Sequence, residues 1–107
     1  MEIIRGDTKE INVTITKNGE PYVPLGEKVV FTVKKDYEED SPILIQHEVI
    51  NSKVMITHED TVNLEYGKYV YDVRVYRPDL SEVQTPIIGT LKIVKVVNND
   101  LKKGVEQ

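Results

Sequence analysis

His47 and His58 are the only imidazole side chains of the sequence, which has no cysteine. Near neutral pH an imidazole can act as a general base or as a metal ligand. No H-x-H or H-E-x-x-H spacing links the two residues, and a two-histidine metal site would also need a carboxylate, such as Glu59 or Asp60 beside His58. We therefore expect packing and solvent exposure for both histidines, and we predict no metal site.

Two groups of carboxylates, Glu38-Glu39-Asp40 and Glu59-Asp60, could supply an acid and base pair or calcium ligands. Neither follows the D-x-D-x-D-G pattern of a calcium-binding loop, so both are expected to be solvated. The sequence also has no G-x-S-x-G motif and no glycine-rich phosphate loop. We predict no catalytic residue, no cofactor and no enzyme activity.

The tripeptide Arg5-Gly6-Asp7 is one that animal adhesion receptors recognise on a protruding loop. A structural role explains the same residues. Gly6 allows the chain to bend between a short extended arm and the first long strand, and Asp7 can bond to neighbouring amides. We favour the structural role.

Six tyrosines accompany one phenylalanine and no tryptophan. Tyr22, Tyr37 and Tyr76 are expected on loops or on outward positions, where a ring can stack on a sugar or anchor an interface. Tyr69 follows a bend at Gly67 and begins a strand. Immunoglobulin-like sandwiches have a tyrosine at this position whose hydroxyl bonds to upstream backbone, so we predict a structural corner.

Alternating apolar and polar residues define the elements that must position these side chains. Strands are predicted over 9–16, 28–35, 43–50, 54–56, 67–76, 83–85 and 91–96, with an extended arm over 2–5. Ile43, Ile45 and Val49 are expected on the inner face of their strand, and Leu44 and Ile50 on the outer face. One short helical turn is predicted over 57–64, because Thr57 can cap it.

Three irregularities are also predicted between or within these strands. Residues 17–26 should form a long ordered connection, although they contain an Asn-Gly pair. Gly89 should separate the last two strands. The alternation slips by one residue near Lys95, which indicates a bulge.

The composition agrees with a β-rich fold. Val, Ile and Thr supply 35 of 107 residues, Leu only 6, and Ala none. These β-branched residues fit a pleated surface. We predict one all-β domain over residues 1–97, an antiparallel immunoglobulin-like β-sandwich of seven or eight strands with one short helical turn, followed by a polar C-terminal tail over 98–107.

Charge and hydropathy argue against two kinds of partner, nucleic acids and membranes. The net charge of −4 argues against nucleic acid. No run approaches the roughly 18 apolar residues that cross a bilayer, and the start lacks the plan of a secretory signal. We expect a soluble chain that is made in the cytoplasm and does not bind a membrane.

The order of several turn and corner residues resembles one known family. They are Arg5-Gly6-Asp7-Thr8, Asn18-Gly19-Glu20-Pro21, Leu25-Gly26, residues 29–34, Glu59-Asp60-Thr61, Leu64, Gly67, Tyr69, Tyr71-Asp72-Val73, Thr85 and Gly89-Thr90-Leu91. The sequence resembles the small immunoglobulin-like proteins encoded among tail and baseplate genes of phages and prophages in Gram-positive bacteria. It is similar to the N-terminal domain of baseplate upper proteins over residues 3 to 97.

The resemblance implies a virion structural role in a tail or baseplate, without catalytic residues. The expected partners are other virion or tail subunits and further copies of the chain. The expected location is the host bacterial cytoplasm during assembly, and then the virion. The candidate contact residues are Ile3 and Ile4 in the arm, and Leu44 and Ile50 on the outer face of their strand.

An alternative function is a carbohydrate-binding or host-surface attachment module. It would use Tyr22, Tyr37 and Tyr76 as stacking platforms for a glycan, and it predicts that at least two of these rings lie coplanar on one exposed face. Rings at opposite ends of the molecule would argue against it.

Overall fold

A computed structural model describes residues 1–22 and 24–95, and strands make up 54% of it and helix 4%. The chain is therefore mostly β, as its β-branched composition predicts. No helix in the described residues has the length and apolar character needed to cross a membrane. The predicted tail, 98–107, and the last two residues of the predicted domain lie outside the described residues.

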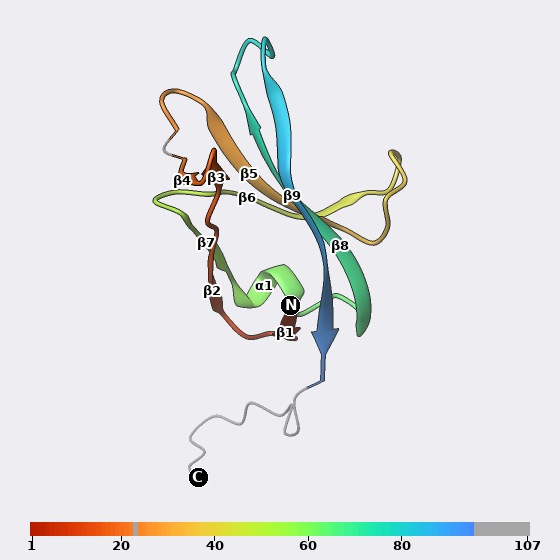
Figure 1. Ribbon diagram of the computed structural model, residues 1–107. Coiled ribbons are helices and arrows are strands. Elements are labelled where there is room, and N and C mark those ends of the chain that lie inside the picture. The colour runs from red at the N-terminus through yellow and green to blue at the C-terminus, as the bar shows by residue number, and fades with distance from the viewer. Residues whose placement is uncertain (23, 96–107) are drawn as a thin grey trace.

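The main sheet is twisted and has five strands in the order β1-β9-β8-β5-β6 (Figure 1). Their bounds are Glu2–Ile4 for β1, Val83–Val94 for β9, Gly67–Tyr76 for β8, Lys28–Lys34 for β5 and Ile43–Glu48 for β6. β1 runs parallel to β9, with Ile3 opposite Ile93, and the other pairs are antiparallel. The prediction of a wholly antiparallel fold is wrong at β1, because no tight turn joins β1 to β9 and fixes their relative direction.

The remaining strands form two smaller antiparallel sheets. They pair β2 (Lys9–Asn12) with β7 (Lys53–Ile56) and β3 (Thr16–Lys17) with β4 (Glu20–Pro21). Asn18 and Gly19 join β3 to β4 with positive φ angles of 54° and 81°, which suit a two-residue hairpin turn. The connection over 17–26 therefore begins as a tight hairpin, contrary to the prediction. The described residues contain nine strands, where seven or eight were expected.

One helical turn, α1 (His58–Thr61), follows β7 within the range predicted for it. The Thr57 side chain accepts a hydrogen bond from the Asp60 amide, and the Asp60 side chain accepts one from the Thr57 amide. This capping box satisfies two amides near the helix N-terminus that have no partner within the helix. Thr61 is completely buried, which fixes the turn against the core.

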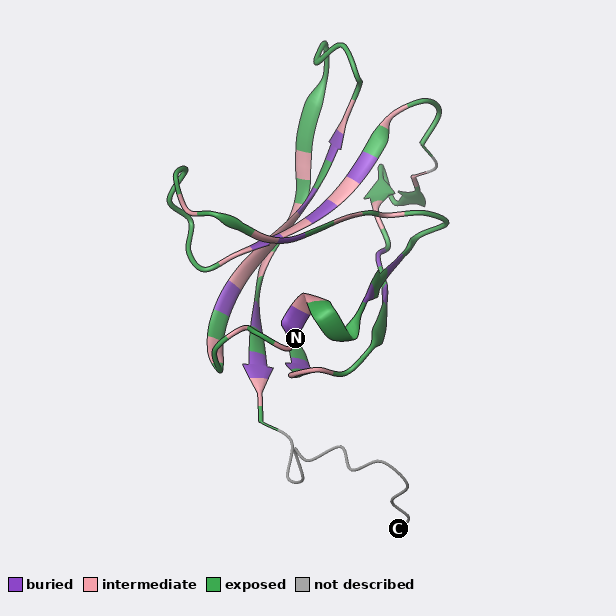
Figure 2. Cartoon of the chain, turned by 180° about the vertical axis from the view of Figure 1, so that it is seen from behind, coloured by how far each residue is buried: buried purple, intermediate pink, exposed green. Residues whose placement is uncertain are grey.

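The β2–β7 pair and the inner face of the main sheet share one apolar core. Phe31 and Val33 of β5 are fully buried in it, together with Ile56 of β7. Figure 2 shows buried segments, in purple, on both of these sheets. Burying one side chain of this size contributes about 1.5–3 kcal/mol. The shared core therefore holds the two sheets together and leaves the other face of the main sheet to solvent.

A β-bulge in the β5–β6 pair changes which side chains of β6 face the core. Val33 lies opposite Ile45, but Lys34 lies opposite Ile43, so Leu44 is an extra residue between two pairs. Leu44 packs against the core, whereas Ile43 is exposed. The predictions that Ile43 faces inward and Leu44 outward are both wrong, because one extra residue shifts the alternation.

β9 continues through Gly89, where a break between two strands is predicted from the sequence. Gly89 lies opposite Tyr71 of β8, and a Cβ on Gly89 would be 2.8 Å from the Tyr71 ring. Glycine is therefore needed here for the close approach of a ring, and not for a turn. The irregularity of the β8–β9 pair lies between Val73 and Val75, and not near Lys95, which follows the end of β9.

Candidate functional site

The face of the main sheet that points away from the core carries an open hollow of about 770 Å³, which we call the outer hollow. Alternation along β5 and β8 places every second side chain on this face. The floor of the outer hollow is formed by Val30, Thr32, Lys34, Val70, Asp72 and Arg74. Val30 pairs with Arg74 and Thr32 with Asp72, so the two charged residues lie at the centre of the floor.

Two loops border the outer hollow at its ends. The loop between β5 and β6, yellow in Figure 1, supplies Tyr37, and the loop between β8 and β9 supplies Leu80. Lys34 Nζ donates hydrogen bonds to two carbonyl oxygens of the first loop. The amide of Arg77 donates to the carbonyl oxygen of Glu82 across the second loop. Hydrogen bonds within each loop therefore fix the two loops that border the hollow.

Aliphatic side chains surround the polar floor. Leu80 and Ile88 are 67% and 63% exposed, and Ile43 and Val83 are also exposed. A single exposed apolar residue is normal on a protein surface, whereas several around one hollow mark a surface that a ligand or a partner covers. The rim of the outer hollow is therefore suited to an interaction.

The floor offers hydrogen-bonding groups of both charges. Gln46 Nε2 donates to Thr32 Oγ1 at 3.0 Å, and Arg74 Nε donates to Thr85 Oγ1 at 3.4 Å. Within the described residues, neither Asp72 nor Arg74 forms an ion pair. The Asp72 carboxylate and the Arg74 guanidinium therefore lie on the same face of β8, where both can bind a ligand.

The tyrosines proposed for stacking divide between two places. Tyr37 and Tyr76 both line the outer hollow. Tyr22 packs against the core and lines a separate hollow of about 500 Å³. Burial and a hydrogen bond to the Glu27 carboxylate raise the pKa of Tyr22. Two of the three rings therefore line one hollow, at its opposite ends.

The four candidate contact residues do not form one surface. Ile3 is 1% exposed and packs within the core, so it cannot offer its side chain to a partner, and we remove it from the candidate contacts. Leu44 also packs against the core. Ile4 and Ile50 are exposed, but β1 and β6 are the two opposite edges of the main sheet, and Ile50 lies in the turn after β6.

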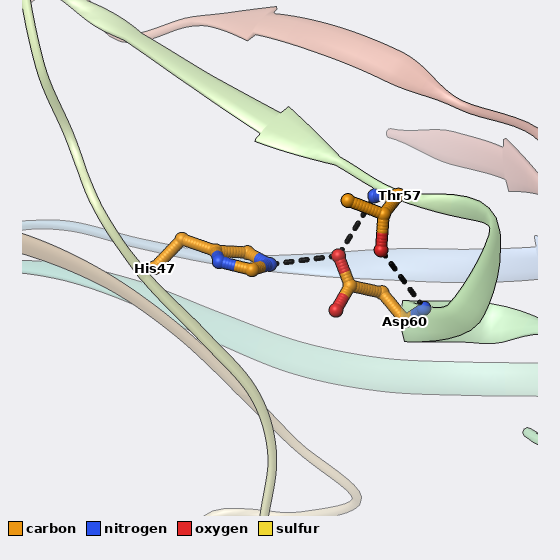
Figure 3. A network of polar contacts seen from close by, with 3 residues as sticks. All are labelled: His47, Thr57 and Asp60. Atoms are coloured by element: carbon orange, nitrogen blue, oxygen red, sulfur yellow. Dashed lines mark hydrogen bonds and ion pairs between the residues drawn. The ribbon is translucent and has the colours of Figure 1, made fainter.

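His47 links β6 to the cap of α1 (Figure 3). Its Nε2 donates to Asp60 Oδ2 at 2.7 Å, and the same oxygen accepts the Thr57 amide at 2.8 Å. Burial acts to raise the pKa of Asp60, but the Thr57 amide and His47 lower it, and the net effect is a pKa below the usual value. His47 lies opposite Phe31, a core residue, so its strand position faces away from the outer hollow. The contact joins β6 to α1, and His47 does not line the outer hollow.

His58 binds the bend that contains Arg5, Gly6 and Asp7. Its Nδ1 donates to the Gly6 carbonyl oxygen at 2.6 Å, and the Gly6 amide donates to Thr61 Oγ1 at 2.8 Å. The Arg5 guanidinium lies 4.2 Å from the centre of the Tyr66 ring. Gly6 has a φ of +87°, which few other residues adopt. The tripeptide is therefore held against α1, which favours its structural role.

Tyr69 lies at the start of β8, and its hydroxyl donates to the Glu65 carbonyl oxygen at 2.6 Å. Burial and the negative charge of Glu65 raise the pKa of Tyr69. Gly67 precedes it with a φ of +136°, so the bend needs glycine. The positively charged Lys35 Nζ lies 4.4 Å from the centre of the Tyr69 ring.

The metal and acid clusters considered from the sequence do not assemble into a centre. Within residues 1–22 and 24–95, no three His, Cys, Asp or Glu side chains come close enough to hold a metal ion. Sequence reasoning missed Asp72, Arg74 and Ile88 as candidate site residues. Alternation along 67–76 could have placed Asp72 and Arg74 on the outer face, but the hollow itself depends on the pairing of four strands.

Comparison with known proteins adds no identification. No family model matches the chain, and no curated protein matches its sequence.

Proposed function

We propose that this chain is a non-catalytic structural module of a phage or prophage tail or baseplate, which acts through protein–protein contacts. The resemblance of the sequence to small baseplate proteins is the reason for proposing that the chain belongs to a phage or prophage particle. The observation that carries the mode of action is the outer hollow, where Ile43, Leu80 and Ile88 remain exposed around a polar floor. Exposed aliphatic groups gain most from a partner that removes them from water.

The finer fold that we propose is an immunoglobulin-like β-sandwich of the variable type. The order β9-β8-β5-β6, with β2 beside β7, is the order of strands G-F-C-C′ with B beside E in such domains. The hydrogen bond from Tyr69 to Glu65 at the start of β8 corresponds to the tyrosine corner of this fold. Both observations support the proposal. Such a domain is a rigid carrier for an interaction surface on its exposed sheet.

The composition of purified particles tests the function. Particles induced from a bacterium that carries the gene should contain the chain at a fixed ratio to other tail proteins, as measured by mass spectrometry. Tape-measure or tail-fibre genes beside it would add support. Particles without the chain would contradict the proposal.

A substitution on the rim of the outer hollow tests whether the chain acts through protein–protein contacts at this surface. Ile88→Glu places a charge on the rim of the outer hollow without entering the core, and it should reduce incorporation into particles. Lys17→Glu changes an exposed residue of β3 and should leave incorporation unchanged.

A second candidate function is attachment to a carbohydrate. The observation that favours it is that Tyr37 and Tyr76 line the same hollow, beside Asp72, Arg74 and Gln46. Aromatic faces with a few polar groups are typical of small-ligand sites. A glycan array with the purified chain should then give hits that Tyr37→Ala removes and Tyr66→Ala, outside the hollow, retains. An array without hits would exclude this candidate.

A further inference from the structure

The centre of the outer hollow carries two opposite charges in a fixed order. Asp72 and Arg74 are next-but-one neighbours on β8, so both side chains are on the same face, about 7 Å apart along the strand. Neither forms an ion pair within the described residues. The surface is therefore complementary to one that presents the same two charges in reverse order.

A second copy of this chain presents the charges in that order. A two-fold axis that lies in the plane of contact and crosses the strands between residues 72 and 74 places Arg74 of each copy over Asp72 of the other. The two resulting ion pairs are equivalent by symmetry. Opposite charges placed across an interface fix its register and exclude other orientations.

The same rotation exchanges the two ends of the hollow. One end holds Tyr37, in the loop after β5, and the other holds Tyr76 and Leu80, at the end of β8 and in the loop that follows it. Tyr37 of one copy therefore meets Tyr76 and Leu80 of the other. Tyr37 on one side and Tyr76 with Leu80 on the other flank the central charges, and the end with Tyr37 also carries Lys34, Asp36 and Glu39. Large side chains around a pair of charges reduce its contact with water.

We propose that two copies of this chain associate face to face through their outer hollows. This inference rests on the function proposed above, because it names the partner of the same surface. A contact of this kind closes after two copies, since each uses the same patch. It covers Ile88 and Leu80, which are exposed on the single chain.

Sedimentation velocity of the full chain over a wide concentration range tests the inference, with charge reversals at the centre. The unaltered chain should shift from monomer to dimer as its concentration rises. Arg74→Asp or Asp72→Arg alone places like charges opposite each other and should weaken association by about tenfold or more. The double reversal restores opposite charges across the axis and should restore association. The double reversal also restores opposite charges within each chain, so each single variant must keep the circular dichroism spectrum of the unaltered chain for the rescue to report on the interface.

A further variant and a control guard against effects on folding. Leu80 has a φ of 61°, which asparagine adopts readily, so Leu80→Asn removes an apolar contact in a compatible backbone and should weaken association. Lys17→Asp makes the same change of charge as Arg74→Asp on the exposed strand β3 and should have no effect.

A chain that stays monomeric at every concentration would overturn the inference, and so would a dimer that the charge reversals and Leu80→Asn leave intact. A monomer that binds a glycan in the hollow would also overturn it. The chain found in purified particles but monomeric alone overturns this inference and leaves the proposed function standing. A dimer with the expected rescue, from a chain absent from all particles, supports the inference and contradicts the proposed function.

Discussion

Asp60 forms three hydrogen bonds that connect α1 to its surroundings. Its carboxylate accepts hydrogen bonds from the Thr57 amide and from His47, and its amide donates to the Thr57 hydroxyl. One side chain thus caps α1 and joins it to β6. The sequence favoured packing and solvent exposure over a ligand or base role for both histidines, and the structure places each in a contact between elements, His47 with Asp60 and His58 with Gly6.

The lowered pKa of Asp60 predicts a loss of stability in acid. Because the folded state holds this pKa below its unfolded value, about 3.8, the ionised carboxylate stabilises the fold above that pH. This contribution falls as the pH decreases through the folded pKa. Asp60→Asn should therefore lower the free energy of unfolding at neutral pH and flatten its decrease between about pH 5 and pH 2.

Urea unfolding over a series of pH values measures this effect. Asp40→Asn, in an exposed loop, is the matched control and should retain the pH dependence of the unaltered chain. Identical pH dependence of Asp60→Asn and the unaltered chain would show that ionisation of the Asp60 carboxylate does not stabilise the fold.

At the scale of elements, α1 is the anchor of the N-terminal arm. Thr61, at the end of α1, accepts the Gly6 amide, and His58, at its start, binds the Gly6 carbonyl. Gly6 in turn directs β1 onto the edge of the main sheet beside β9. A four-residue helix with little stability of its own therefore depends on the contacts that it makes with the arm and with β6.

Replacing Thr61 by valine tests this anchor. Thr61→Val keeps the shape of a completely buried side chain but removes the acceptor of the Gly6 amide, 2.8 Å away. An unsatisfied amide in a partly buried position should lower the free energy of unfolding by about 1–2 kcal/mol.

Thermal or urea unfolding measures the loss, and Thr14→Val, at an exposed position, is the control. The amide of Gly6 should also exchange its hydrogen faster in Thr61→Val than in the control. An unchanged exchange rate would mean that the bend does not depend on α1.

At the scale of the whole molecule, the small β2–β7 sheet and the main sheet cannot be separated without opening a single core. Ile11 and Val54 of the small sheet belong to the same buried cluster as Phe31 and Leu91 of the main sheet. A two-stranded sheet alone is only marginally stable in water. Its stability therefore depends on the apolar face of the main sheet.

This shared core predicts a single cooperative unfolding transition. Secondary structure followed by far-ultraviolet circular dichroism and tertiary packing followed by the tyrosine signal in the near ultraviolet should give the same midpoint in urea. Tyr69 and Tyr71 report on packing, because Tyr69 is buried and Tyr71 contacts Phe31 with ring centres 5.5 Å apart. Two separate midpoints would mean that the β2–β7 layer unfolds on its own.

The sequence alone determined the β-rich class, the approximate position of most strands, the turn of helix over 57–64 and the bend before Tyr69. Each of these depends on neighbours close in the chain: alternation along a strand, a capping threonine, or a glycine with positive φ. The local pattern was sufficient there because the physical cause is local.

Only the tertiary structure decided the direction of β1, the bulge that turns Leu44 inward and Ile43 outward, and the placing of Tyr37 and Tyr76 in one hollow with Asp72 and Arg74. Each depends on which strands pair and in what register, and many pairings of one alternating pattern bury the same apolar residues. The core selects one of them through packing between residues far apart in the chain, and the outer hollow is formed by that selection.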